Sequence, residues 1–142
     1  MNNVGLVLKR KNMLPVTISP ESSVFDALAI MAEKNIGALV VMQDDKYLGI
    51  VTERDYSRKV ALKGKHSDVT KVSEIMTTNL PEILSTDKIE YCMELMTTRN
   101  IRYMPVIENN KLTGIISMSD VVKETILSQK DTIDHLQNYI NS

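Results

Sequence analysis

The feature that most constrains the fold is an internal repeat, in which residues 88–125 resemble residues 23–60 at an ungapped offset of 65 positions. Eight of these 38 positions are identical, whereas average amino-acid usage gives roughly two or three identities by chance. Many of the remaining pairs are apolar in both copies, so the copies share one pattern of buried residues. The identical pairs are Met31/Met96, Asn35/Asn100, Ile36/Ile101, Val41/Val106, Lys46/Lys111, Gly49/Gly114, Ile50/Ile115 and Asp55/Asp120.

Each copy begins with a predicted amphipathic helix. Residues 24, 27, 28 and 31 in one copy, and 89, 92, 93 and 96 in the other, are apolar and follow the spacing of one buried helix face. Ser22 and Asp87 suit the N-cap position of these helices, and Asn35 and Asn100 suit a left-handed C-cap. An extended stretch is expected before each helix, at residues 15–19 and 81–85.

A predicted β-hairpin follows in each copy, because two short apolar runs are joined by a polar turn. The expected strands cover residues 38–42 and 47–51, and residues 103–107 and 112–116. A second helix is expected after Thr52 and Ser117. Each copy is therefore a βαββα unit, and two such units packed sheet to sheet predict one compact, pseudo-symmetric α+β module. Ligands are expected in the clefts where the copies meet.

The predicted domain organisation follows the repeat. Residues 1–62 form the first unit, the polar segment 63–71 is a linker, residues 72–128 form the second unit, and residues 129–142 are a helical tail. Upstream of the repeat, residues 4–8 resemble residues 72–76 at an offset of 68. In the tail, Ile133, Leu136 and Ile140 recur at helical spacing, which favours a helix packed on the core over a dimer contact.

Composition excludes several classes of partner. The net charge is −1, with 17 basic and 18 acidic residues interspersed, so no basic stripe points to nucleic acid. No apolar run approaches the ~20 residues that a membrane span needs. Cys92 is the single cysteine, which rules out an intrachain disulfide and favours a cytoplasmic location.

The sequence offers little to catalysis. Cys92 lies on the apolar helix face, where a free thiol is ordinarily buried and inert. His66 and His135 have no second ligand at metal spacing, and no Gly-rich phosphate loop is present. We therefore expect no enzyme activity, no catalytic residue, no metal site and no required cofactor.

The most specific local feature is the end of each hairpin. Residues 49–55 read Gly-Ile-Val-Thr-Glu-Arg-Asp, and residues 114–120 read Gly-Ile-Ile-Ser-Met-Ser-Asp. A Thr or Ser followed three residues later by an acid is typical of a capping box at a helix start. The same geometry suits a ligand, because a helix N-terminus attracts phosphate and an aspartate accepts hydrogen bonds from ribose hydroxyls. Arg54, a cation in the first helical turn, opposes the helix dipole, and a nearby phosphate would remove that conflict.

These motifs, together with the Asn-Ile-Arg-Tyr-Met-Pro-Val stretch at residues 100–106, resemble a tandem pair of CBS domains over roughly residues 4–128. The resemblance implies a non-catalytic regulatory module that binds adenosine-containing ligands such as AMP, ADP, ATP, NAD or S-adenosylmethionine. It also implies a homodimer through the CBS helices. A bound nucleotide would change the relative angle or rigidity of the copies, and a protein partner, which the sequence does not identify, would respond to that change.

The resemblance also assigns site residues. Asp55 and Asp120 would bind ribose, Thr52 and Ser117 would supply hydroxyls, and Arg54 and Ser119 would contact phosphate. Each motif would face the hairpin of the opposite copy. One cleft would then combine Thr52, Arg54 and Asp55 with Ile101, Arg102 and Tyr103, and the other Ser117, Ser119 and Asp120 with Ile36, Gly37 and Ala38. Val16 and Pro81 would add to the lining.

The two clefts differ in charge. Arg54 and Arg102 both belong to the first, and guanidinium groups suit phosphate geometry. The second has Ser119 and Gly37 at the equivalent positions, unless Lys9, Arg10 or Lys11 reaches it. The first cleft is therefore predicted to bind the more highly charged ligand, or to bind it more tightly. The alternative function is a module that binds no ligand and only dimerises or docks on a partner.

Overall fold

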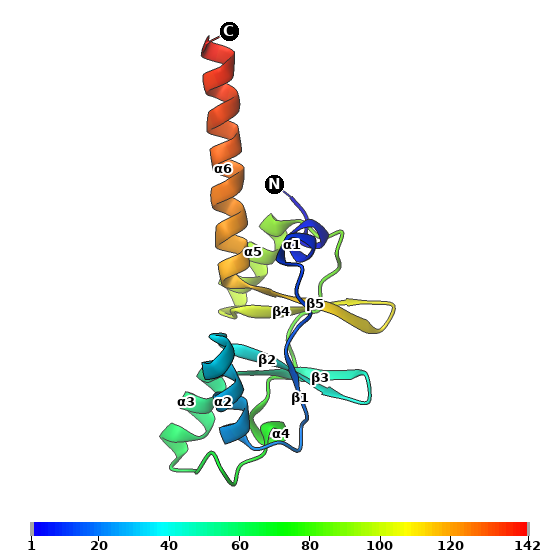
Figure 1. Cartoon of the computed structure of the whole chain (residues 1–142), viewed down its shortest axis with the longest axis vertical. Coiled ribbons are helices and arrows are strands. Elements are labelled where there is room, and N and C mark those ends of the chain that lie inside the picture. The colour runs from blue at the N-terminus through cyan, green and yellow to red at the C-terminus, as the bar shows by residue number, and fades with distance from the viewer. Residues whose placement is uncertain (1, 142) are drawn as a thin grey trace. The chain divides into compact units, whose positions relative to one another are not determined.

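The computed structural model describes residues 2–141 and divides the chain into two compact units (Figure 1). The first-repeat unit consists of Leu14–Leu80. The second-repeat unit combines the chain up to Met13 with the chain from Pro81 onward. Each unit packs helices against one small sheet, so the predicted α+β class is confirmed.

The first-repeat unit contains a three-stranded sheet in the order β1-β2-β3. Strand β1 pairs with β2 in parallel, and β2 pairs with β3 as an antiparallel hairpin. The elements of this unit are β1 (Thr17–Ile18), α2 (Val24–Lys34), β2 (Ala38–Gln43), β3 (Lys46–Thr52), α3 (Glu53–Lys59), a short 3₁₀ turn (Ala61–Lys63) and α4 (Val72–Ile75).

The second-repeat unit repeats this plan around an antiparallel β4–β5 hairpin. Ile83 takes the place of β1 and forms a single parallel bridge with Val106. The elements of this unit are α1 (Val4–Lys11), α5 (Ile89–Arg99), β4 (Tyr103–Glu108), β5 (Lys111–Ser117) and α6 (Met118–Asn141). The predicted helix and hairpins are thus confirmed in both copies.

Local sequence explains where these elements end. Asn35 and Asn100 adopt the predicted left-handed C-cap, each with φ 53°. Both hairpins turn through two residues with positive φ, as a type I′ turn requires, and these are Asp44, Asp45, Asn109 and Asn110.

The predicted N-caps are one residue too early. Ser23, and not Ser22, caps α2, because its side chain accepts a hydrogen bond from Asp26 N. In the second copy the N-cap position is Lys88, and Asp87 instead accepts a hydrogen bond from Leu84 N.

Helices α1 and α4, which precede the first and the second repeat, are exchanged between the units. Helix α1 packs with the second repeat, where Val4 N donates to Asp87 O at 2.9 Å. Helix α4, which precedes the second repeat, packs with the first, where Val72 N donates to Ser22 O at 2.8 Å. The buried side chains of Val4 and Val72 explain this packing, because each completes the core of the unit that it joins.

This exchange corrects the predicted domain boundaries. Residues 1–62 do not pack as one unit, since the chain up to Met13 belongs with the second repeat. The segment 63–71 is not a bare linker, because Thr70 is buried and its carbonyl accepts a hydrogen bond from Val24 N at 2.8 Å. Hydrophobic spacing identified the repeat, but it could not show which copy each flanking helix joins.

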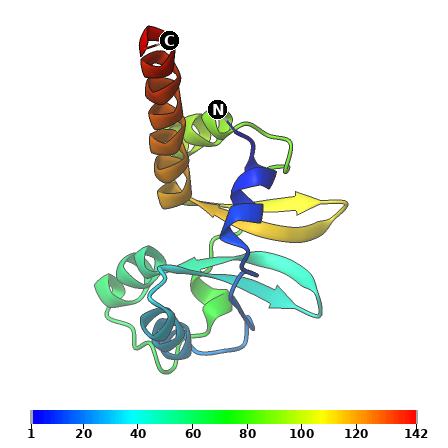
Figure 2. The same cartoon turned by 45° about the horizontal axis from the view of Figure 1, so that its top comes forward.

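The expectation that the C-terminal tail packs on the core is wrong. Helix α6 runs without a break to Asn141 and extends well beyond the β4–β5 hairpin (Figure 2). Its apolar residues are exposed: 54% of Ile133, 58% of Leu136 and 76% of Ile140. None of the helices in the described chain, α6 included, is both long enough and apolar enough to cross a membrane.

Candidate ligand-binding site

The two repeated motifs both form the start of a helix. At α3, Asp55 N donates to Thr52 Oγ1 and Thr52 N donates to Asp55 Oδ2, both at 3.0 Å. At α6, Asp120 N donates to Ser117 Oγ at 3.1 Å and Ser117 N donates to Asp120 Oδ2 at 2.9 Å. The capping-box interpretation is therefore confirmed in both copies. The environments of the two aspartates nevertheless differ.

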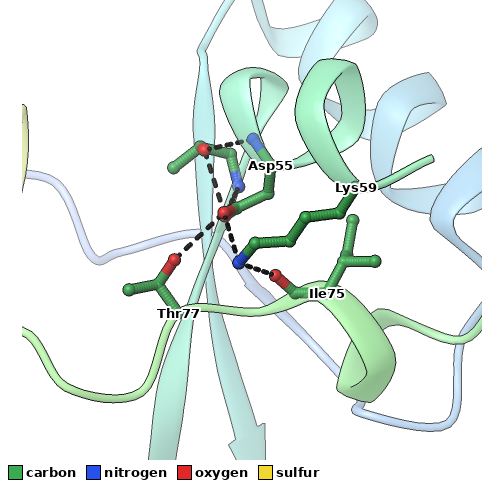
Figure 3. Close-up of polar contacts among 5 residues, drawn as sticks. Asp55, Lys59, Ile75 and Thr77 are labelled. Carbon is green, nitrogen blue, oxygen red and sulfur yellow. Dashed lines mark hydrogen bonds and ion pairs between the residues drawn. The ribbon is translucent and has the colours of Figure 1, made fainter. Parts of the chain in front are cut away.

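Asp55 is engaged on both carboxylate oxygens (Figure 3). Oδ2 accepts hydrogen bonds from the Thr52 N–H and hydroxyl, and Oδ1 accepts one from the Thr77 hydroxyl, each at 3.0 Å. Lys59 Nζ lies 3.0 Å from Oδ1 and also donates to Ile75 O at 2.8 Å. The side chain of Asp55 is only 8% exposed. Four protein donors thus bind the carboxylate of Asp55, to which the family resemblance gives the role of binding ribose.

Gly49 explains how Thr77 reaches this position. The backbone of Thr77 forms an antiparallel bridge with Ile50, with hydrogen bonds of 3.0 and 2.8 Å. A Cβ atom on Gly49 would lie 2.6 Å from Thr77 O, so a side chain there would push this segment away. The motif glycine of the first copy therefore keeps Thr77 close enough to bind Asp55.

Asp120 has a different partner, supplied by α1. Lys11 Nζ lies 2.9 Å from Asp120 Oδ2 and donates to Ile115 O at 3.1 Å. The side chain of Asp120 is 15% exposed and that of Lys11 is 29% exposed, so both remain within reach of solvent. The sequence suggested Lys11 only as one of three basic residues that could reach this copy. The structure selects it.

A second polar cluster holds α1 on α6, and sequence reasoning missed it. Glu124 stands at the repeat position of Lys59, so the charge is reversed between the copies. The side chain of Glu124 is only 3% exposed and accepts hydrogen bonds from Arg10 and Asn2. The charge reversal at an aligned position was the available signal, because a buried carboxylate needs a cation or donors from another segment.

A pocket of 480 Å³ lies in the second-repeat unit, between the end of α5 and the start of α6. Its polar side chains include Arg102, Ser117 and Ser119. The equivalent pocket of the first-repeat unit measures 370 Å³; Gly37 stands there at the position of Arg102, and Glu53 at the position of Met118. One pocket thus presents a guanidinium and two hydroxyls, and the other presents a carboxylate.

Strand pairing explains which predicted residues meet. Tyr103 is the register partner of Ser117 at the open end of the hairpin, and Met118 N donates to Arg102 O at 2.8 Å. The structure therefore brings Ile101, Arg102 and Tyr103 together with Ser117 and Ser119 of their own copy. In the first copy, Ala38 pairs with Thr52 in the same way, and Ile36 and Gly37 line a pocket with Glu53. The predicted pairing of residues from opposite copies stays a prediction.

Neither pocket lining includes the other predicted residues, which are Thr52, Asp55, Ala38, Asp120, Val16, Pro81 and Arg54. Val16 is half-buried against the first-repeat core, and its carbonyl accepts a hydrogen bond from Val40 N. Pro81 is half-buried in the second-repeat unit, and Arg54 is half-buried on the first turn of α3. None of the three is among the residues that line the two pockets.

Cys92 is a core residue. Its side chain is fully buried beside Met96 and Met104. Burial, together with the negative charge of Asp87, raises the pKa of the Cys92 thiol to about 11. A thiol in this state is a poor nucleophile. Within the described residues, no group of three His, Cys, Asp or Glu side chains could hold a metal ion.

Sequence comparison decides the family. A family model for the CBS domain matches residues 13–62 and again residues 72–127. The chain belongs to the CBS domain family. The CBS pair is 37% identical over 125 residues to the mitochondrial CBS domain-containing protein CBSX3 of Arabidopsis thaliana; the match covers 84% of this chain and 61% of the relative.

Solved structures agree with this assignment. The CBS pair matches the crystal structure of the CBS-domain containing protein ATU1752 from Agrobacterium tumefaciens with a TM-score of 0.82 and 39% identity, over 87% of this chain and 99% of the other. It also shares its fold with the CBS domain protein PAE2072 from Pyrobaculum aerophilum, which was solved as a complex with AMP. That match has a TM-score of 0.72 and 24% identity over 83% and 88% of the two chains.

Proposed function

We propose that the CBS pair is a non-catalytic regulatory module that binds an adenine nucleotide at the start of α6. The observation that carries this proposal is the 480 Å³ pocket lined by Arg102, Ser117 and Ser119. Ser117 is hydrogen-bonded to Asp120, which forms an ion pair with Lys11. A pocket of this volume lies within the range for small-molecule sites. Its polar groups gather at a helix N-terminus, where anions are stabilised.

Charge favours the second repeat over the first. Arg102 is an exposed side chain on the pocket wall, and its guanidinium suits the bidentate recognition of a phosphate. The matching wall of the first-repeat pocket carries Gly37, and the helix start carries Glu53, whose negative charge opposes a phosphate. We therefore propose that the nucleotide binds more tightly at the Asp120 motif than at the Asp55 motif, because Arg102 lines the same pocket as Ser119 of its own copy.

The two aspartates support the same choice. Asp55 already accepts hydrogen bonds from Thr52 and Thr77 and forms an ion pair with Lys59. A ribose would therefore have to displace these protein groups. Asp120 is the more exposed of the two aspartates. Its partner is Lys11, whose flexible side chain can bend toward solvent. We assign Asp120 the role of ribose acceptor and Asp55 a mainly structural role.

Regulation without catalysis is consistent with the family, since CBS domain pairs are regulatory, ligand-binding modules. The AMP complex of the Pyrobaculum aerophilum protein shows that the shared fold can hold an adenine nucleotide. We propose AMP, ADP, ATP or NAD as the class of ligand. A cytoplasmic location and a homodimer through the CBS helices stay predictions.

The test is nucleotide binding by wild type, Asp120→Ala and Asp55→Ala, measured by thermal shift and calorimetry with AMP, ATP, NAD, S-adenosylmethionine, adenosine and GTP. A true ligand stabilises the folded protein by mass action, by ~2.7 kcal/mol at one hundred times its Kd, and so raises the melting temperature. We expect Asp120→Ala to lose this response and Asp55→Ala to keep it. Binding lost only in Asp55→Ala would reverse our assignment. A flat response of wild type to every ligand would leave a module that docks on partners without a nucleotide.

A further inference from the structure

The exposed part of α6 carries an apolar stripe along one side. Val122 and Ile126 are 50% and 59% exposed, and the stripe continues through the exposed residues Ile133, Leu136 and Ile140. Val121 and Glu124, which lie on another side of the same helix, are buried against the second-repeat unit. The stripe is therefore not the face by which α6 is attached to its own unit.

The spacing of this stripe is that of a coiled coil. Residues 122, 126, 129, 133, 136 and 140 alternate steps of four and three, which is the a/d pattern of a heptad repeat. Isoleucine occupies every a position of this stretch, at Ile126, Ile133 and Ile140. The d positions are Val122, Gln129 and Leu136. Along the helix axis the stripe spans about 27 Å.

We propose that this stripe pairs with the same stripe of a second copy of the chain, as a parallel two-stranded coiled coil. β-Branched residues at a with leucine at d favour two strands; isoleucine fills all three a positions here, and Leu136 fills one of the three d positions. In a coiled coil, the a and d residues of one helix pack between those of a second helix with the same heptad pattern. Another copy of α6 supplies such a helix. Gln129 is the single polar residue in the seam, and a lone polar residue there fixes the register at some cost in stability.

The flanking charges select the parallel orientation. Lys123 and Lys130 occupy e positions, whereas the g positions hold Thr125, Thr132 and Tyr139. In a parallel pair each e position faces a g position, so the lysines face uncharged side chains. In an antiparallel pair e positions face one another, which would bring lysines of the two copies together. The seam begins at Val122 and Ile126, within the second CBS domain, and continues beyond that domain through Ile133, Leu136 and Ile140.

The first test is the mass of the protein in solution. We expect the Ile133→Asp/Leu136→Asp variant to have half the wild-type mass by sedimentation equilibrium, because two buried carboxylates would open the seam. His135→Asp/Asn138→Asp is the matched control, since it adds the same charges within the same heptad but off the stripe. The control should keep the wild-type mass. Far-UV circular dichroism checks that every variant remains folded, as expected for exposed positions.

The second test is the orientation of the pair. Ile140→Cys places a thiol at one end of the seam, while the native Cys92 is buried and unavailable. Mild oxidation should link two copies through residue 140 in a parallel pair, and should not do so in an antiparallel pair, where the two ends lie far apart. An unlinked dimer that Ile133→Asp/Leu136→Asp dissociates would overturn the parallel arrangement. A wild-type mass that the aspartates leave unchanged would overturn the coiled coil.

Discussion

The ammonium group of Lys11 lies 2.9 Å from Oδ2 of Asp120, so helix α1 brings a positive charge to the first turn of α6. Lys11 also donates to Ile115 O, which fixes its side chain across the end of β5. The pair places a cation, an acceptor and a helix N-terminus within one small region. A nucleotide offers the complementary groups, because its ribose donates hydrogen bonds and its phosphate is an anion.

The first prediction concerns ligand charge. Lys11→Ala should weaken binding of AMP by about tenfold, since a hydrogen bond to a charged group contributes about 1.4 kcal/mol or more. Binding of adenosine, which has no phosphate, should change little. Calorimetric titration of both ligands separates the two effects. Lys9→Ala removes the same charge from an exposed position of the same helix and should leave both affinities unchanged; an equal loss in the two variants would contradict a specific role for Lys11.

The second prediction compares the two motif glycines. A Cβ atom on Gly49 would meet the backbone oxygen of Thr77 at 2.6 Å, whereas one on Gly114 would meet the side chain of Leu8 at 2.7 Å. A leucine side chain can rotate and a paired backbone cannot. Gly49→Ala should therefore lower the free energy of unfolding by about 2 kcal/mol or more, and Gly114→Ala by about 1 kcal/mol. Urea denaturation of both variants measures the difference, and equal losses would contradict it.

The third prediction concerns Asp55. Its removal in Asp55→Ala breaks the capping box, leaves the Thr77 hydroxyl without its acceptor and removes the ion-pair partner of Lys59, which should cost about 2 to 3 kcal/mol of folding free energy. Asp120→Ala removes the equivalent, more exposed carboxylate and should cost about 1 kcal/mol. Chemical denaturation in the absence of nucleotide measures both. A larger cost for Asp120→Ala would show that Asp55 is not the more structural of the two.

The fourth prediction concerns the attachment of α1. Glu124 is buried and Arg10 is about half exposed, so a double-mutant cycle of Arg10→Ala and Glu124→Ala should give a coupling energy of about 1 kcal/mol. Glu124→Ala alone should be the more damaging change, because it also removes the acceptor of Asn2. Thermal denaturation of the four proteins completes the cycle. Strictly additive effects would mean that the ion pair contributes nothing to the packing of α1.

The fifth prediction concerns alkaline pH. Burial, with a further effect of Asp87, raises the pKa of Cys92 in the folded protein from 9.0 to about 11. Between these values the unfolded chain has lost the thiol proton and the folded chain keeps it, so the unfolded state binds fewer protons. The free energy of unfolding should therefore fall as the pH rises through this range. Denaturation curves of wild type and Cys92→Ala isolate the contribution, which should be absent from the variant.

The repeated helix and hairpin could be predicted because their signals are local. The apolar spacing around Met31 and Met96, the C-caps at Asn35 and Asn100, and the polar turns all act within a few residues. The capping boxes could be predicted for the same reason. The family resemblance rested on the same residues and is confirmed by the match to the CBS domain model.

The partners of the two aspartates could not be predicted, because they come from distant segments. Thr77, which follows α4, and Lys11, at the end of α1, approach the equivalent positions of the two copies at sequence separations of 22 and 109 residues. The two donors are not aligned in the repeat, so no comparison of the copies reveals them. The apolar spacing of α6 predicts a face packed on the core, and this prediction is wrong. A helical apolar pattern identifies an apolar face but not the surface against which that face packs.

The exchange of α1 and α4 also has a consequence for synthesis on the ribosome. Helix α1 is made first, yet the residues that cover its apolar side belong to the second repeat, which emerges only after Pro81. Leu14–Leu80 carries its own helix α4 and can close its core while the rest is still being translated. The N-terminal helix must wait for most of the chain, and during that interval Val4 and Val7 remain open to chaperones or to a neighbouring nascent copy.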